Sequence, residues 1–175
     1  NNFSFSKYMQ VFGLFFNKEF ILKNYEIERK FLPANDKEIL SIIKDLPYKS
    51  MIQAYLNLKP VVRVRKEDDE YYLTYKGEGS IAKEEYNLKL NEESFYNLLK
   101  KCDGNIIEKE RYNVKLSDKL VAEVDIFQGK FEGLILIEVE FENVEEAKVF
   151  TAPDWFGRDV SYEKEYHNAY MSTLA

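Results

Sequence analysis

Charged residues recur at every second position along several segments of this chain. The segment NYEIERKFL (residues 24–32) places Glu26, Glu28 and Lys30 two residues apart. In an extended strand successive side chains point to opposite faces, so these three share one face and Ile27 lies on the other. Two carboxylates are therefore expected side by side next to one ammonium group.

The same sorting of charge recurs on other segments. Like-charged or polar residues two positions apart are Arg63 with Arg65, Thr74 with Lys76, Lys109 with Arg111, Glu123 with Asp125, and Glu138 with Glu140. A one-sided sheet with a charged, solvated face is one explanation. Such a face normally mixes charges of both signs, because like charges roughly 7 Å apart along a strand repel each other. We therefore expect these side chains to line a cavity.

A cavity of this composition could hold a chain of phosphates together with a divalent cation. Acidic pairs supply the oxygen ligands that Mg²⁺ or Mn²⁺ prefers. Clustered arginine and lysine side chains bind phosphate oxygens. A sulfate, a carboxylate or a nucleic-acid backbone would engage the basic residues but leave the acidic residues unpaired.

Alternating hydrophobicity predicts about eight strands. They are residues 24–32, 49–58, 61–67, 71–79, 84–90, 106–116, 121–128 and 134–142. Short turns between consecutive strands indicate an antiparallel sheet. Eight antiparallel strands can close into a barrel wide enough for side chains or one small ligand. The expected fold class is α+β, mainly β, with flanking helices, and the strands would line a cavity if they form a closed eight-stranded antiparallel β-barrel.

The helical spacing of apolar residues and the capping residues predict four helices that flank this barrel. The predicted helical ranges are residues 36–46, 92–104 (capped by Asn91 and stopped by Gly104), 144–150 and 164–174. Residues 25–175 are expected to form one domain. Residues 1–24 form an N-terminal extension of uncertain role, which could be a processed segment or a helix that packs on the domain or a partner.

Composition limits the kinds of partner. With 25 basic and 31 acidic residues the net charge is −6, which argues against a nucleic-acid surface. Cys102 is the only cysteine, so an intrachain disulfide and a cysteine-rich zinc site are excluded. No apolar run reaches membrane-spanning length. We expect a cytoplasmic monomer or homodimer that binds a small molecule, with no nucleic-acid or membrane partner.

Ordered motifs resemble one known family. The motif EIERK is similar to the ExExK signature of the CYTH superfamily, also called triphosphate tunnel metalloenzymes. The resemblance continues in order over residues 25–175, through QAYL, VRVR, LTYKGEG, EKERY, AEVDIFQG, IEVEFE and PDWFGRDVSYEKEYHNAYMSTLA. It implies a tunnel that binds a triphosphate group with Mg²⁺ or Mn²⁺.

The resemblance also implies roles for individual residues. The implied metal ligands are Glu26, Glu28, Glu138 and Glu140, with Asp125, Glu123 and Glu85 as further candidates. The implied phosphate-binding residues are Lys30, Arg63, Arg65, Lys76, Lys109 and Arg111. Tyr55 resembles a tunnel tyrosine that acts with the signature lysine, and Lys30, Tyr55 and Glu28 are the catalytic candidates. One departure concerns the strand often written RxEYE in bacterial relatives, where KEEYN has Asn87 at the second acidic position.

These observations favour divalent-metal-dependent hydrolysis of a phosphoanhydride bond in inorganic tripolyphosphate or a related short triphosphate. One alternative is the class IV adenylate cyclase branch, although its HFR motif is replaced here by PVVRVR. Another is a non-catalytic triphosphate or polyphosphate sensor. The motifs do not choose among tripolyphosphate, nucleoside triphosphates and thiamine triphosphate, or between the metals. His167, the single histidine, is expected to have a structural or surface role.

Overall fold

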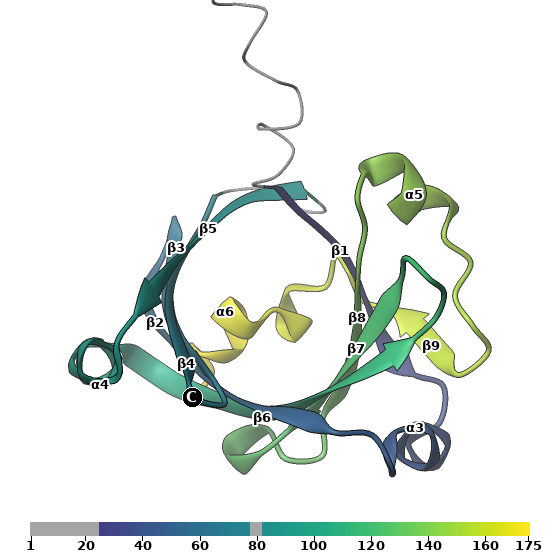
Figure 1. Ribbon diagram of the computed structural model, residues 1–175, viewed down its shortest axis with the longest axis horizontal. Helices are drawn as coiled ribbons and strands as arrows, with labels where there is room; N and C mark the ends of the chain where they lie inside the picture. The colour runs from purple at the N-terminus through teal and green to yellow at the C-terminus, as the bar shows by residue number, and fades with distance from the viewer. Residues whose placement is uncertain (1–24, 78–81) are drawn as a thin grey trace, which may run out of the picture.

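The computed structural model describes residues 25–77 and 82–175, and its main feature is a ring of antiparallel strands (Figure 1). The strands are β1 (Tyr25–Pro33), β2 (Tyr48–Leu58), β3 (Val61–Glu67), β4 (Glu70–Lys76), β5 (Ala82–Leu90), β6 (Asp103–Lys115), β7 (Val121–Phe127), β8 (Ile135–Glu140) and β9 (Phe156–Asp159). The order around the ring is β5-β4-β3-β2-β6-β7-β8-β1, and β5 pairs with β1, so the order returns to its first strand. The predicted mainly β, eight-stranded antiparallel barrel is confirmed.

A ninth strand was not predicted. β9 pairs with the end of β1 at Phe31 and Pro33, outside the ring of eight. It is only four residues long, and this is too short for a period-two pattern to stand out in the sequence. The predicted extension at residues 1–24 lies outside the described residues.

The helices are short, and three of the four in the described residues begin at asparagine caps. They are α3 (Asp36–Ile43), α4 (Glu92–Leu99), α5 (Val144–Val149) and α6 (Asn168–Met171), with 3-10 turns η1 (Gly129–Phe131) and η2 (Lys164–Tyr166). The Asn35 side chain accepts hydrogen bonds from two backbone N–H groups of α3, and Asn91 and Asn143 cap α4 and α5 in the same way. None of the helices in the described part of the chain is long and apolar enough to cross a membrane.

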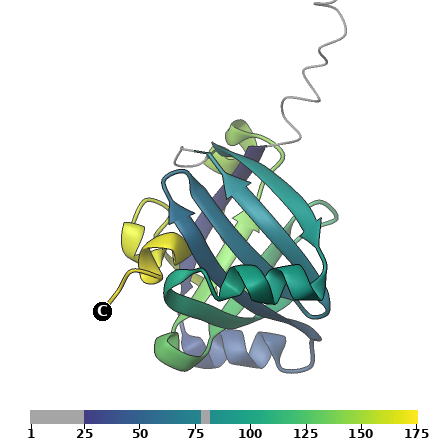
Figure 2. The same ribbon diagram turned by 90° about the vertical axis from the view of Figure 1, so that its left-hand side faces the viewer.

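The prediction of one continuous helix over residues 164–174 is wrong, because the segment forms two separate helical turns. His167 has an extended backbone, which separates the η2 turn from the single turn of α6. The predicted helices 36–46 and 92–104 are also shorter, because the chain leaves the helix at Lys44 and at Lys100. The ring seen end-on in Figure 1 and from the side in Figure 2 has the C-terminal turns at one end of the barrel.

Two clusters of the apolar core lie between the barrel wall and the helices. One cluster joins the outer faces of β1, β7 and β8 to α3 and α5 and includes Ile27, Ile39 and Val139. A second joins Val64 and Tyr71 to Phe95 of α4, which lies across the outside of the strands (Figure 2). Burial of these outward-facing side chains against the helices stabilises the outer face of the barrel. The inward faces are therefore free to carry charge.

Gly104 ties the start of β6 to the C-terminal turns. Its φ is +80°, and a Cβ atom added there would overlap the carbonyl oxygen of Ser172. We expect Gly104→Ala to lower the free energy of unfolding by about 2–4 kcal/mol, since backbone strain and a steric clash add. Urea denaturation measures this loss. Gly133→Ala is the control, because Gly133 has a φ of +93° but open space around it, so strain alone costs about 1 kcal/mol.

Candidate active site

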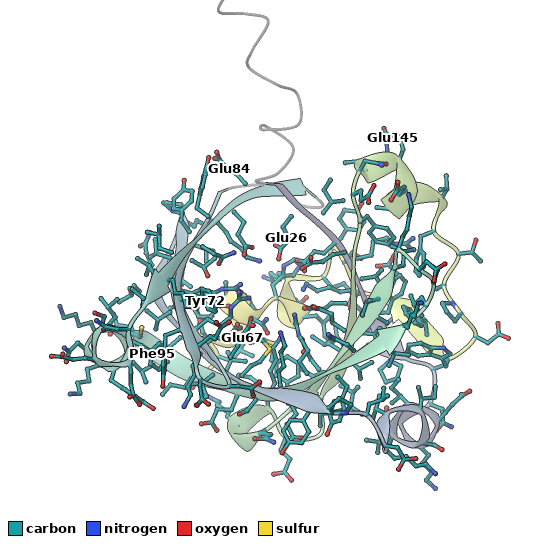
Figure 3. The ribbon with its side chains drawn as sticks, viewed as in Figure 1. Glu26, Glu67, Tyr72, Glu84, Phe95 and Glu145 are labelled. Carbon is teal, nitrogen blue, oxygen red and sulfur yellow. The ribbon has the colours of Figure 1, made fainter. Side chains whose placement is uncertain are left out.

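The charged faces of the strands point into the ring and enclose a polar chamber of about 290 Å³. In Figure 3 Glu26 and Glu67 lie within the ring, whereas Glu84 and Phe95 lie outside it. All the predicted charged site residues except Asp125 line this polar chamber, together with Met51, Gln53, Glu67, Asn87 and Asn168. Strand alternation thus brings residues from all eight barrel strands to one place.

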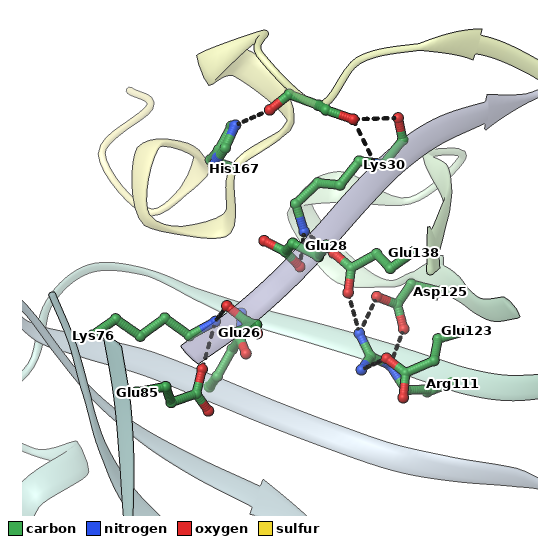
Figure 4. Close-up of polar contacts among 12 residues, drawn as sticks. Glu26, Glu28, Lys30, Lys76, Glu85, Arg111, Glu123, Asp125, Glu138 and His167 are labelled. Atoms are coloured by element: carbon green, nitrogen blue, oxygen red, sulfur yellow. Dashed lines mark hydrogen bonds and ion pairs between the residues drawn. The ribbon is translucent and has the colours of Figure 1, made fainter. Parts of the chain in front are cut away.

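Lys30 lies at the centre of one network of ion pairs (Figure 4). Its ammonium group donates to Glu28 at 3.0 Å and to Glu138, and it is 5% exposed. Burial by itself favours the neutral amine, but the neighbouring carboxylates of Glu138 and Glu28 outweigh it and raise the pKa of Lys30. Lys30 is therefore a fixed positive charge in the polar chamber.

Asp125 lies behind the chamber wall and not on it. Its side chain is fully buried and accepts hydrogen bonds from Lys109 and, at 2.6 Å, from both Nε and Nη2 of Arg111. Arg111 also donates to Glu123 and, at 2.5 Å, to Glu138. The resemblance implied Asp125 as a further candidate near a metal site, and in the structure its carboxylate pairs with the two cations Lys109 and Arg111.

A second network lies across the chamber. Lys76 donates to Glu26, and its ammonium group lies 2.9 Å from Glu85. The guanidinium of Arg63 lies 3.9 Å from Glu85, but its Nε atom is buried and has no hydrogen-bond partner among the described residues, whereas Nε of Arg65 lies 3.1 Å from Glu67. A buried donor without an acceptor is costly, so it indicates a place for anionic oxygens.

Asn87 orients Glu85 in this second network. Its amide nitrogen donates to Glu85 at 2.8 Å, and its amide oxygen accepts a hydrogen bond from Thr74 at 2.6 Å. The amide therefore fills the position of the second acid with a bridging role. Lys76 and Arg63 hold the pKa of Glu85 at about 2 against the opposing effect of burial, so this carboxylate stays charged.

Carboxylates are in local excess around Glu140. Partial burial, together with the neighbouring Glu123 and Glu26 and despite Arg111, raises the pKa of Glu140 to about 7. In the described part of the chain, no three acidic, histidine or cysteine side chains are already arranged as metal ligands. Several of the carboxylates are instead bonded to lysine or arginine. Hard oxygen donors with surplus negative charge nevertheless fit a hard divalent cation.

A second, larger chamber of about 470 Å³ adjoins the polar chamber on the side of the C-terminal turns. We call it the mouth chamber, and it is lined by Glu28, Lys30, Tyr55, Leu58, Lys59, Pro60, Val61, Arg63, Lys76, Gly77, His167, Asn168 and Ala169. The Tyr55 hydroxyl accepts a hydrogen bond from Gln53 at 3.3 Å, and burial raises the pKa of Tyr55. Tyr55 is therefore a predicted site residue that lines the mouth chamber but not the polar chamber.

Sequence reasoning overlooked several lining residues. Gln53 and Glu67 share strand faces with Tyr55 and Arg65, so the same period-two argument would have found them. His167 and Asn168 have no such signal. His167 was expected to be structural or on the surface, and it does contact the carbonyl of Ser161 at 3.1 Å, but it also lines the mouth chamber (Figure 4).

Comparison with known proteins identifies the family. The CYTH domain matches residues 24–167 of this chain. The chain belongs to the CYTH domain family. The resemblance read from EIERK and the motifs that follow it is therefore confirmed.

Relatives of this CYTH domain include two inorganic triphosphatases. The chain is 36% identical over 148 residues to one from Nitrosomonas europaea, which covers 82% of this chain and 93% of the relative. It is 35% identical over 148 residues to one from Acetivibrio thermocellus, covering 82% and 90%. A crystal structure of an inorganic triphosphatase aligns with a TM-score of 0.62 and 33% identity, over 86% of this chain and 95% of that one.

A more distant structure shares the fold alone. A putative adenylate cyclase from Bacillus halodurans aligns with a TM-score of 0.55 over 87% of this CYTH domain chain and 94% of its own, at 15% identity. The barrel is thus common to proteins with different assigned reactions. The side chains in the chamber, not the barrel, have to carry the argument for function.

Proposed function

We propose that this protein hydrolyses a phosphoanhydride bond of inorganic tripolyphosphate, with Mg²⁺ or Mn²⁺ as cofactor. The observation that carries the proposal is the polar chamber, in which cationic and anionic side chains from seven of the eight barrel strands face one another. The similarity to named inorganic triphosphatases supports it. The proposed setting is the cytoplasm, with the protein acting as a monomer or homodimer.

The chain's own residues would bind and orient the phosphates. Lys30, Arg63, Arg65, Lys76, Lys109 and Arg111 supply the cationic side chains. Hydrolysis adds one water across a P–O–P bridge and releases orthophosphate and pyrophosphate. Phosphoryl transfer requires mainly positioning and neutralisation of charge on the phosphate oxygens, and fixed cations such as Lys30 provide both. The neutral Tyr55 hydroxyl can donate a hydrogen bond to a bridging or terminal oxygen.

Carboxylates would hold the cofactor. Glu26, Glu28, Glu138 and Glu140 are the proposed ligands, with Glu123 and Glu85 nearby. When bound, the cation would polarise phosphate oxygens and orient or activate water. Asp125 is proposed to act differently, as the buried anion that holds Lys109 and Arg111 in place.

Phosphate release is the direct test. Tripolyphosphate, ATP and thiamine triphosphate are each supplied with Mg²⁺, Mn²⁺ or EDTA, and orthophosphate and cyclic AMP are both measured. We expect metal-dependent release that is fastest with tripolyphosphate. Cyclic AMP from ATP would favour the cyclase instead, and tight tripolyphosphate binding without release in any metal would favour a sensor.

Metal and substrate are expected to bind cooperatively. In the structure Lys30 and Lys76 are bonded to carboxylates, so a phosphate that takes these cations leaves buried acids unpaired unless a metal neutralises them. Calorimetry with diimidotriphosphate, whose P–N–P bridges resist hydrolysis, should give affinity 5- to 150-fold higher with Mg²⁺ than with EDTA.

The carboxylate Glu140 provides the variant for this measurement. Glu140→Gln should shrink the difference in affinity between Mg²⁺ and EDTA, because it removes one of the acids in excess. Glu84→Gln is the matched control, since Glu84 lies outside the ring (Figure 3). Equal affinity for diimidotriphosphate in Mg²⁺ and EDTA would rule out the coupling.

A further inference from the structure

One residue of the polar chamber does not come from the barrel. Every other described residue that lines the polar chamber lies on β1 to β8, whereas Asn168 is the first residue of α6. Asn168 also lines the mouth chamber, and the two chambers share Glu28, Lys30, Arg63 and Lys76 with it. Asn168 therefore lies at the boundary between the chambers, next to three of the cations.

The side-chain oxygen of Asn168 has no partner. Its Oδ1 atom is buried and accepts no hydrogen bond from any described residue. A buried amide oxygen left in this state is costly, and folded proteins rarely keep one without a reason. The α6 turn does not need this side chain, because it is the backbone carbonyl of Asn168 that accepts the Ser172 N–H at 3.0 Å.

The segment that carries Asn168 is fixed to the strand that carries Lys30. The backbone N–H of Lys30 donates to Ser161 Oγ at 2.9 Å, and the carbonyl of Ser161 contacts Nε2 of His167 at 3.1 Å (Figure 4). Asn105 of β6 donates to two carbonyl groups of the C-terminal turn, at 3.2 and 2.7 Å. These hydrogen bonds fix the segment that carries Asn168 against β1 and β6 in the protein without ligand.

We propose that Asn168 is a further substrate-binding residue, which donates an amide hydrogen bond to a phosphate oxygen at the boundary of the two chambers. This inference rests on the proposed function. Rotation of the amide about χ2 exchanges its oxygen for its nitrogen donors, and it breaks no hydrogen bond of Oδ1 because there is none. A neutral donor also adds a phosphate contact without adding a further cation, which would itself need a carboxylate partner when no phosphate is bound.

The test compares two substitutions of Asn168 by steady-state kinetics on tripolyphosphate with Mg²⁺. Asn168→Ala removes one neutral hydrogen bond and should raise KM about 3- to 10-fold. Asn168→Asp places a negative charge beside the phosphates and should lower kcat/KM by more than about 10-fold. Asn97→Asp is the control with the same change of charge, because Asn97 is exposed on α4 and lines neither chamber.

Thermal unfolding without substrate separates binding from folding. Because Oδ1 of Asn168 has no hydrogen-bond partner among the described residues, both Asn168 variants should keep the Tm of the unaltered protein within a few degrees. If both variants lose Tm heavily, or if Asn168→Asp matches Asn97→Asp in kcat/KM, the inference is wrong while the proposed function stands. If the unaltered protein neither binds nor hydrolyses tripolyphosphate, the proposed function itself fails.

Discussion

Replacing Lys30 with methionine is expected to lower kcat/KM for tripolyphosphate by about 10²- to 10³-fold. Lys30 is 5% exposed, it lines both chambers, and neighbouring carboxylates keep it charged. Methionine keeps most of the side-chain volume but removes the charge that would face the phosphates. Phosphate release from tripolyphosphate with Mg²⁺, at a temperature well below the Tm of the variant, measures the loss.

A lysine on the opposite face of the wall provides the control. The ammonium group of Lys66 lies 5.6 Å from the ring of Tyr71, which packs against α4 outside the barrel. Lys66→Met therefore removes the same charge from the outer surface and should leave kcat/KM within about twofold, since a surface charge away from special features has little effect. Full activity in folded Lys30→Met would overturn the assignment of the polar chamber as the active site.

Substitution of Asp125 by asparagine is expected to lower the free energy of unfolding by about 3–5 kcal/mol. The change leaves Lys109, which is 2% exposed, beside Arg111 without their shared counter-charge. Burial and the charge of Arg111 already lower the pKa of Lys109, so loss of the carboxylate makes its protonated form still less favourable. Urea denaturation in EDTA measures the effect without any contribution from a bound metal.

The matched control is Glu123→Gln. Glu123 pairs with the same arginine, but a quarter of its side chain is exposed, so the loss should stay below about 1 kcal/mol. This comparison separates two roles of the acidic pair on β7. An Asp125→Asn variant as stable as the unaltered protein in EDTA, but deficient in metal binding, would identify Asp125 as a ligand rather than a structural anion.

The sequence by itself determined which side chains share a face. Glu26, Glu28 and Lys30 project together because a strand alternates its side chains, whatever the strand pairs with. Repetition of this pattern on successive segments, joined by short turns, was enough to predict the antiparallel barrel and the charged interior. The Asn91 cap predicted where one helix begins, since a capping side chain bonds to backbone groups only two or three residues away.

The partner of each charge was decided only by the tertiary structure. Spacing makes Glu123 and Asp125 look equivalent, yet Glu123 lines the polar chamber whereas Asp125 is fully buried and pairs with Lys109. Likewise, nothing local to Asn168 indicates that a C-terminal turn, held to β1 through Ser161, carries it to the boundary of the chambers. Contacts between residues far apart in the chain depend on how whole strands pack, and local periodicity carries no information about that.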